Sequence, residues 1–320
     1  MGSIRFENRV VVVTGAGQGL GRAYALEFAR RGAAVLVNDI GSAVDGRGEL
    51  SDRVASAVVE EIRAAGGRAE ANFDSVSSPE GARRIIEAAQ DHFGGVDVVV
   101  TNAGTIRFTP FHETPSEDFQ LMLDVHLGGN FYVAQAAYRV MQRRNYGRFV
   151  LVSSNSGFLG LETQAAYGAA KAGVMGLNNQ ISLEGAKYGI RSNALMPVAV
   201  TRMAGVRKAE DGGESRSELE RLLPVIGQRL TPDHVVPLVV YLGSEQCQQT
   251  GQMFSAVGGR YVRAVRGIPR GWAASDPAPP SVEDLAAHWD EVVSTAGLRE
   301  PRTGIEEIAF VAEQLAATAR

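Results

Sequence analysis

Tyr167 and Lys171 are the residues of this 320-residue chain whose types and spacing most directly suggest chemistry. They lie four residues apart in a stretch with helical periodicity, so both side chains are expected on one face of a helix. A tyrosine phenol, with a pKa of about 10, is a poor base at neutral pH, but a nearby ammonium favours the phenolate. Ser154 precedes Tyr167 by thirteen residues and is placed to hold a substrate oxygen by a hydrogen bond. The pattern predicts proton transfer at the oxygen of an alcohol, although a Tyr/Lys pair alone is also typical of an ordinary helix surface.

A glycine-rich turn near the N-terminus predicts a phosphate-binding loop. The segment TGAGQGLG at 14–21 follows an apolar run and precedes a helical pattern. Glycines allow the backbone to approach a pyrophosphate, and the start of a helix offers free N–H groups. A tight turn without a ligand is the alternative interpretation. The residues expected to bind a dinucleotide here are Gly15, Gln18, Gly19, Leu20 and Gly21.

Asp39, at the end of the second predicted strand, bears on the choice of cofactor. A carboxylate at this place accepts hydrogen bonds from ribose hydroxyls and repels a 2′-phosphate, which favours NAD over NADP. Arg22, at the start of the first helix, is a counter-indication because it could face a 2′-phosphate, and a helix cap is the simpler role for Asp39. Residues at the ends of the next two strands are expected to line the same crevice, with the adenine near the first pair: Asp74, Ser75, Asn102 and Gly104.

The elements that must position these residues alternate in type along the chain. Predicted strands occupy 10–13, 33–38, 68–73, 96–101, 148–153, 190–195 and 252–257, and predicted helices occupy 19–31, 51–65, 79–93, 115–144, 164–188, 282–293 and 305–319. Near-continuous apolar strands alternating with helices predict an α/β fold with a parallel sheet covered on both faces. We expect one domain over residues 1–258 and a C-terminal helical extension over 259–320 that packs on the body or on a second subunit.

Two segments interrupt this alternation. Residues 41–50 (GSAVDGRGEL) are glycine-rich and polar, which predicts a long loop after the second strand. Residues 201–223 are charged at first and then weakly helical, so they form either a solvated surface segment or a lid.

Composition excludes several classes of protein. The chain has 32 Lys and Arg against 36 Asp and Glu, a net charge of −4, which argues against a nucleic-acid partner. Cys247 is its one cysteine, so there is neither an internal disulfide nor a cysteine-based zinc site, and no metal is expected. No apolar run reaches the roughly 18 residues of a membrane span, and residues 1–8 lack a signal core. We therefore expect a cytoplasmic protein.

These motifs together resemble the short-chain dehydrogenase/reductase family over about residues 6–258. The segments that carry the resemblance are TGAGQGLG at 14–21, NAG at 102–104, Ser154 and YGAAK at 167–171. Within the family the chain is most similar to the (3R)-hydroxyacyl-CoA dehydrogenase unit of peroxisomal multifunctional enzyme type 2, on the glycine-rich insertion after Asp39, NFDSV at 72–76 and VHLGGNFYVAQAA at 125–137. The resemblance implies a Rossmann-type doubly wound sheet of about seven strands in the order 3-2-1-4-5-6-7.

The resemblance also implies roles for individual residues. Tyr167 would act as the base, while Lys171 would lower its pKa and bind the cofactor ribose, so that both border the dinucleotide. Thr201 would bind the nicotinamide carboxamide, beside Pro197.

The sequence departs from the family pattern at three places. At 101–106, TNAGTI replaces the more usual NNAG-type segment, which the resemblance places at the substrate entrance. The usual asparagine of the catalytic tetrad is replaced by His126, which either takes its place or merely packs on a helix, and Asn130 is a weaker candidate for the role. The usual Pro-Gly pair is Pro197-Val198.

The expected activity is an NAD-dependent interconversion of a secondary alcohol and a ketone. The resemblance implies (3R)-3-hydroxyacyl-CoA as the substrate, and Arg202, Arg207 and Lys208 are candidate partners for the phosphates of an acyl-CoA. An alcohol of a steroid, polyketide or terpenoid pathway is the alternative substrate, and a catalytically silent nucleotide-binding protein is the alternative function. We expect a homodimer, with a tetramer as the other family arrangement.

Overall fold

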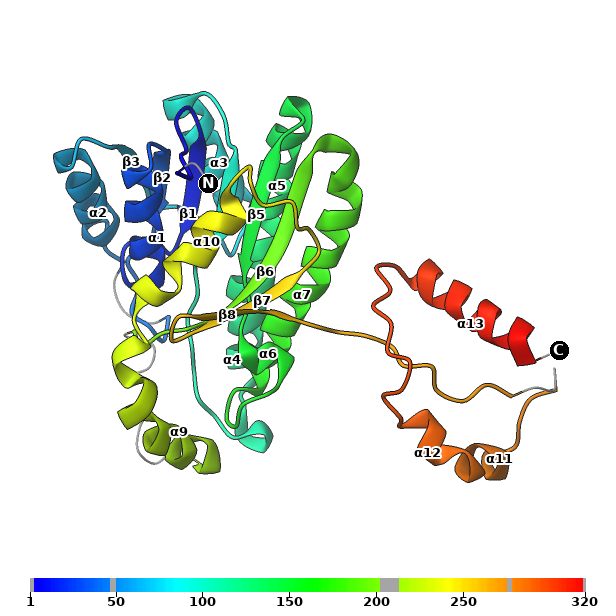
Figure 1. The fold of residues 1–320 in the computed structure, drawn as a ribbon. Coiled ribbons are helices and arrows are strands. Elements are labelled where there is room, and N and C mark those ends of the chain that lie inside the picture. Colours follow the sequence, from blue (N-terminus) through cyan, green and yellow to red (C-terminus); the bar gives the residue numbers. More distant parts are fainter. Residues whose placement is uncertain (1–2, 47–49, 202–212, 275–277, 319–320) are drawn as a thin grey trace. The chain divides into compact units, whose positions relative to one another are not determined.

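An eight-stranded sheet forms the centre of the structure, a computed structural model (Figure 1). The strand order is β3-β2-β1-β4-β5-β6-β7-β8, and every pair from β3 to β7 is parallel. The strands are β1 (Val10–Thr14), β2 (Ala34–Asn38), β3 (Arg68–Asn72), β4 (Val98–Thr101), β5 (Gly147–Val152), β6 (Ile190–Val198), β7 (Met253–Val257) and β8 (Arg260–Ala264). The predicted Rossmann-type sheet and its seven-strand order are confirmed, and β8 is an additional edge strand.

The structure describes all residues except 1–2, 47–49, 202–212, 275–277 and 319–320. In two further helical stretches, 213–219 and 317–318, it describes the backbone but not the side chains. The chain divides into two units, Met1–Arg263 and Ala264–Arg320.

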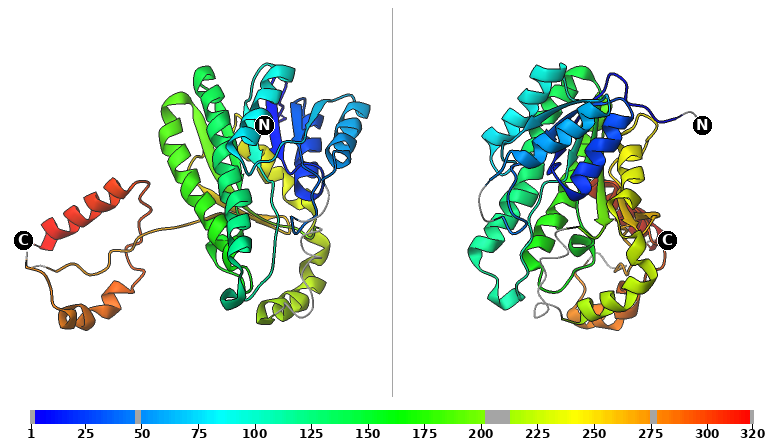
Figure 2. Two further views of the ribbon diagram at one scale, coloured as in Figure 1. Left: turned by 180° about the vertical axis from the view of Figure 1, so that it is seen from behind. Right: turned by 90° about the vertical axis from the view of Figure 1, so that its left-hand side faces the viewer.

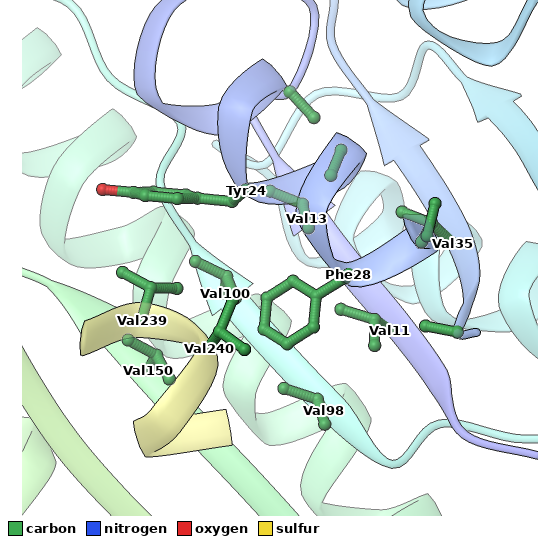
Figure 3. Close-up of a cluster of buried hydrophobic side chains, with 14 of the residues drawn as sticks. Val11, Val13, Tyr24, Phe28, Val35, Val98, Val100, Val150, Val239 and Val240 are labelled. Atoms are coloured by element: carbon green, nitrogen blue, oxygen red, sulfur yellow. The ribbon is translucent and has the colours of Figure 1, made fainter. Parts of the chain in front are cut away.

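Helices cover both faces of the sheet, which explains why β1, β2, β4 and β5 are buried at every position. On one face lie α1 (Gly19–Arg30), α2 (Arg53–Ala64) and α10 (Val236–Gly243). The ring of Phe28 from α1 lies among Val11, Val98 and Val240 at the centre of this layer (Figure 3). On the other face lie α3 (Pro79–Phe93), α5 (Gly129–Arg144) and α7 (Ala165–Gly185), the layer seen from behind in Figure 2.

The prediction of a single helix over 115–144 was wrong in one respect, because the helical segment is not continuous. It consists of α4 (Ser116–Met122), a π-helical turn η2 (Leu123–Gly128) and α5. A π turn inserts one extra residue into the helical ladder and is frequent at functional sites. His126 lies within it.

Several short elements had no counterpart in the prediction. Besides α10 and β8, these are α6 (Asn155–Phe158) and the 3₁₀ turns η1 (Phe111–Glu113), η5 (Gly227–Arg229) and η6 (Pro232–His234). The last turn of the helix predicted over 164–188 is also 3₁₀, as η3 (Ala186–Tyr188). The weakly helical end of the 201–223 segment belongs to α9 (Gly213–Ile226), whereas most of the possible lid lies outside the described residues.

The second unit is helical, as predicted, with α11 (Val282–Ala287), α12 (Trp289–Val292) and α13 (Gly304–Thr318). The predicted helix over 282–293 is interrupted at His288, whose ring stacks on Trp272 with centroids 4.4 Å apart. Taken by itself, the unit buries none of its described residues.

Candidate active site

The glycine loop between β1 and α1 is shaped for a close backbone approach. Gly15 has a φ of +62°, and a Cβ there would lie 2.6 Å from the Cα of Ala103. A Cβ on Gly21 would lie 2.1 Å from the carbonyl oxygen of Gly15. Gln18, which precedes α1, makes no side-chain capping hydrogen bond within the described structure, so it leaves the N–H groups at the helix start able to bind an anion. These features fit the pyrophosphate of a dinucleotide.

Asn102 braces this loop from the end of β4. Its side-chain Nδ2 donates to the carbonyl oxygens of Thr14 (3.2 Å) and Gly15 (3.0 Å). Its backbone N–H donates to the hydroxyl of Thr14 at 3.0 Å. The amide therefore fixes the loop conformation, a role beyond the lining function expected from the sequence.

Asp39 lies against the glycine loop and is held by backbone donors. One carboxylate oxygen accepts the N–H of Gly17 at 2.9 Å, and the other accepts the N–H of Gly41 at 2.7 Å. Each carboxylate oxygen has a further lone pair to offer a ribose hydroxyl. Arg22, the counter-indication for NAD, forms an ion pair with Glu61 of α2 at 2.6 Å.

Asp74 and Ser75 follow β3 in the region expected to receive the adenine. The carboxylate of Asp74 accepts the Nε of Arg84 at 2.6 Å and the Nδ2 of Asn72 at 2.9 Å. The hydroxyls of Ser75 and Ser77 lie 2.8 Å apart. Asp74 is therefore committed to a local network that shapes this end of the crevice.

A cavity of about 280 Å³ joins these groups. Ten of the residues predicted to bind the cofactor line it: Gly15, Gln18, Gly19, Leu20, Asp39, Asp74, Ser75, Asn102, Gly104 and Thr201. Gly21, Tyr167, Lys171 and Pro197 do not line it, and Pro197 lies within β6. The insertion after Asp39 contributes five lining residues that the sequence did not single out: Ser42, Ala43, Val44, Gly46 and Leu50.

Ser154, Tyr167 and Lys171 come from two adjacent elements. Ser154 follows β5 and caps α6, where its Oγ accepts the N–H of Ser156 at 3.1 Å. Tyr167 and Lys171 project from successive turns of α7, and the ammonium lies 5.7 Å from the centroid of the phenol ring. Lys171 is only 2% exposed, and its Nζ donates to the carbonyl oxygen of Val152 at 2.7 Å.

Burial shifts the pKa values of both groups on α7. The pKa of Tyr167 lies above its ordinary value because burial disfavours the phenolate, while the hydrogen bond from Ser154 acts in the opposite direction. Burial lowers the pKa of Lys171 to about 7. Strongly shifted pKa values within one small cluster are typical of catalytic sites.

His126 lies beside this cluster. It is 1% exposed, and its ring meets that of Tyr167 edge to face, with centroids 4.9 Å apart and an angle of 87° between the planes. Its Nε2 lies 2.6 Å from the carbonyl oxygen of Thr105 and 3.3 Å from the backbone nitrogen of the same residue, whereas its Nδ1 is buried without a hydrogen-bond partner among the described residues. Burial and the charge of Lys171 hold the pKa of His126 well below its ordinary value, against the effect of the Thr105 carbonyl.

A model of the short chain dehydrogenase family matches residues 9–211, the part of the chain that carries these groups. The chain belongs to the short-chain dehydrogenases. A Mycobacterium tuberculosis protein named as a short-chain type dehydrogenase/reductase is 45% identical over 293 residues, which cover 92% of this chain and 96% of that protein. Peroxisomal multifunctional enzyme type 2 of Mus musculus is 39% identical over 98% of this chain and 40% of its own length.

Solved structures agree with this assignment. Full-length peroxisomal multifunctional enzyme type 2 from Drosophila melanogaster matches 98% of this chain and 50% of its own, with a TM-score of 0.78 and 32% identity. A short chain dehydrogenase from Mycobacterium avium matches 92% of this chain and 97% of its own, with a TM-score of 0.74 and 34% identity. The dehydrogenase described here thus spans nearly all of the mycobacterial relatives but half or less of the multifunctional enzymes.

In this dehydrogenase Asn130, the weaker candidate for the tetrad position, has a different task. Its Nδ2 donates to the carbonyl oxygen of His126 at 2.6 Å, and its Oδ1 accepts the hydroxyl of Thr101. Asn130 therefore stabilises the π turn that carries His126.

Two further predictions concern the acyl-CoA phosphates and the membrane. Arg202, Arg207 and Lys208, the candidates for binding acyl-CoA phosphates, lie outside the described residues. Among the helices that the structure describes, none is long and apolar enough to cross a bilayer.

Proposed function

We propose that this short-chain dehydrogenase oxidises a secondary alcohol to a ketone with NAD, and that the alcohol is a (3R)-3-hydroxyacyl-CoA. The reaction class rests on one observation: Ser154, Tyr167 and Lys171 form a partly to fully buried cluster with shifted pKa values. The cluster belongs to the same domain as a cavity whose glycines leave no room for side chains.

The roles of the three residues follow from their chemistry. Ser154 donates a hydrogen bond to the substrate oxygen, and Tyr167 removes the hydroxyl proton. Lys171, held by Val152, favours the Tyr167 phenolate once a ligand excludes water from the site. When bound, NAD supplies the acceptor for the hydride that leaves the alcohol carbon.

The preference for NAD rests on Asp39. Its carboxylate faces the start of the glycine loop, and a 2′-phosphate at that place would put two negative charges side by side. The pairing of Arg22 with Glu61 leaves that arginine engaged elsewhere, which supports the same preference.

The substrate class rests on the relatives. Peroxisomal multifunctional enzymes match over nearly the whole of this chain, including its second unit. The cytoplasmic location that the composition favours is part of the proposal and rests on the sequence alone.

We also propose a homodimer. The second unit exposes apolar side chains from all three of its helices, and burying them requires another surface: Val282, Leu285, Trp289, Val293, Ile305, Ile308, Val311 and Leu315. Light scattering should give the mass of two chains, and a stable tetramer would contradict the proposal.

Steady-state kinetics tests the reaction, followed through NADH fluorescence. We expect (3R)-3-hydroxyacyl-CoA to be oxidised and its (3S) isomer to be a poor substrate. We expect kcat/KM with NAD to exceed that with NADP by at least about tenfold, since like charges in contact cost more than about 1.4 kcal/mol. Asp39→Ala should reduce this ratio, whereas Asp52→Ala, at an exposed carboxylate before α2, should leave it unchanged.

The outcomes separate the parts of the proposal. Oxidation of other secondary alcohols but of no hydroxyacyl-CoA would overturn the substrate and keep the reaction class. Binding of NAD without turnover of any alcohol would overturn the reaction class.

A further inference from the structure

Thr105 connects two parts of the site that are far apart in the sequence. The residue is buried between the insertion at 41–50 and the π turn that carries His126. Its hydroxyl donates to the carbonyl oxygen of Val44 at 2.6 Å, while its own carbonyl oxygen lies 2.6 Å from Nε2 of His126. One residue thus joins the wall of the cofactor cavity to the histidine beside Tyr167.

The insertion is well held at this junction. The N–H of Ile106 donates to the same Val44 carbonyl at 3.1 Å, and Nε of Arg107 donates to the carbonyl of Asp45 at 3.1 Å. Arg107 in turn forms an ion pair with Asp118 of α4. These contacts fix the position of the backbone at Thr105 and therefore the direction of its carbonyl group.

That carbonyl decides which nitrogen of His126 carries the proton. Nε2 lies 2.6 Å from this carbonyl oxygen and 3.3 Å from the backbone nitrogen of the same residue, whose N–H points at it. The carbonyl contact is the shorter one and a carbonyl oxygen only accepts, so it favours a proton on Nε2, and a neutral ring then has an unprotonated Nδ1. The ring also packs closely on the backbone of Gly104, where a side chain would clash, since a Cβ there would lie 2.5 Å from its Cε1.

Nδ1 is therefore a buried acceptor that has no partner among the residues that the structure describes. Buried polar atoms are nearly always paired, and an orphan within a catalytic cluster suggests a role in the reaction. Tyr167 of α7 packs against the ring, and the charge of Lys171, one turn further along α7, acts on it. Both groups are donors when protonated. The π turn itself carries Asp124, whose carboxylate accepts Nε2 of Gln120 at 2.7 Å.

We propose that Thr105 is a positioning residue for the reaction. It connects the insertion to His126 and keeps the ring protonated at Nε2. Nδ1 is then a fixed acceptor for the proton donors of the Tyr167–Lys171 pair, directly or through one water. This proposal deepens the proposed function. It assigns the insertion a part in catalysis as well as in forming the cavity.

Nitrogen NMR of the histidine side chains tests this directly and needs no turnover. The chain has five histidines, and the His126→Asn variant identifies the signals of His126. We expect His126 to be neutral and protonated at Nε2 between pH 5 and 8. A ring protonated at Nδ1, or one that is charged at pH 7, would overturn the proposal.

Variants of Thr105 test the connection. Thr105→Val keeps the shape and removes the hydroxyl bond to Val44, and we expect a mixture of tautomers and about a tenfold loss of kcat, the scale of one neutral hydrogen bond. Thr105→Ser, which restores the hydroxyl, should return both measurements to the wild-type values. Thr109→Val is the matched control, since the backbone N–H of Thr109 donates to the carbonyl of Thr163 and the described structure shows no hydrogen bond between Thr109 and His126.

A double variant separates positioning from a general weakening of the fold. If Thr105 acts through His126, adding Thr105→Val to His126→Asn should cause little further loss of kcat. An unchanged tautomer in Thr105→Val, or losses that multiply in full, would overturn the proposal. Neither result depends on the identity of the alcohol, and absent turnover of every alcohol would overturn only the proposed function, because the tautomer is measured without substrate.

Discussion

The polar groups around the glycine loop, the cofactor side of this site, differ from those around Tyr167, the catalytic side, in how completely the protein hydrogen-bonds them. Around the glycine loop, Asp39, Asp74 and Asn102 are each held by two or more hydrogen bonds within the protein. On the catalytic side lie three of the four buried side-chain atoms that lack a partner among the described residues: Nδ1 of His126, Oγ of Ser156 and Oγ1 of Thr163.

This difference reflects two kinds of work. A binding surface gains from a geometry that is fixed before the ligand arrives, because less order is lost on binding. A group that must exchange a proton needs unused hydrogen-bonding capacity and a pKa moved from its usual value. The shifted pKa values of Tyr167, Lys171 and His126 all lie on the catalytic side.

Tyr167→Phe should have the largest effect. It removes the proposed base but keeps the ring that packs on His126, so kcat should fall by about 10²- to 10⁴-fold while NAD still binds. Stopped-flow kinetics and a fluorescence titration measure the two quantities. Tyr241→Phe, at an exposed position on α10, serves as the control. Turnover near the wild-type rate would remove Tyr167 from its assigned role.

Gly21→Ala should damage the cofactor side instead. The new methyl group would overlap the Gly15 carbonyl, which cannot move without displacing the loop, so we expect NAD affinity to fall and unfolding to become easier by about 1–3 kcal/mol. Isothermal titration and chemical denaturation measure both effects. Gly176→Ala on α7 meets no atom within 4 Å and should stabilise the protein slightly. Unimpaired NAD binding by Gly21→Ala would show that the dinucleotide does not lie against the glycine loop.

Lys171→Met should change how stability depends on alkaline pH. In the folded protein Lys171 releases its proton at about pH 7, whereas the unfolded chain keeps that proton until above pH 10. The unfolded state therefore binds more protons in this window, and stability should rise with pH by up to about 1.4 kcal/mol per unit. Denaturation of the protein without cofactor at several pH values should show this slope in the wild type. It should persist in Lys187→Met, at an exposed lysine, and be lost in Lys171→Met.

His126→Asn should have the smallest effect, at acid pH. Because the pKa of His126 is lowered in the folded state, the unfolded chain gains a proton below about pH 6.5 that the folded protein does not take up. The wild type should lose stability as the pH falls below this value, and His126→Asn should lose less. Equal acid sensitivity of the two proteins would mean that His126 can be charged within the fold.

The fold was largely predictable because most of its strands are nearly continuous apolar runs that alternate with helical patterns. The sequence failed where no local signal existed. The π turn at 123–128 has an ordinary helical composition, and it is stabilised by Asn130, which reaches back four residues. The apolar segment VPLVVYLG of α10 has no helical periodicity to distinguish it from a strand, and β8 is a short, partly charged edge strand.

The candidate site was predictable as a set of motifs and less so as a set of contacts. The glycine loop, Asp39 and the Tyr167–Lys171 spacing each carry a local signature. Thr105 contacts Val44, 61 positions before it, and His126, 21 positions after it. Neither of these contacts has a signature in the sequence of the segments that make it. A threonine one residue after a predicted Asn-Ala-Gly turn was the one available signal.

The closed base of the insertion has a consequence for protein engineering. The N–H of Ser51 donates to the carbonyl of Ile40 at 3.2 Å, and Gly41 bends so tightly that a side chain there would strike the Ser51 carbonyl. The chain leaves and re-enters the domain at one point, so lengthening the segment between costs only about 0.6 kcal/mol of closure entropy for each doubling. A reporter peptide inserted after Gly46 would keep the contacts of Val44 and Asp45 with Thr105 and Arg107 and leave Asp39 anchored, which makes this loop a place to build a sensor of the bound nucleotide.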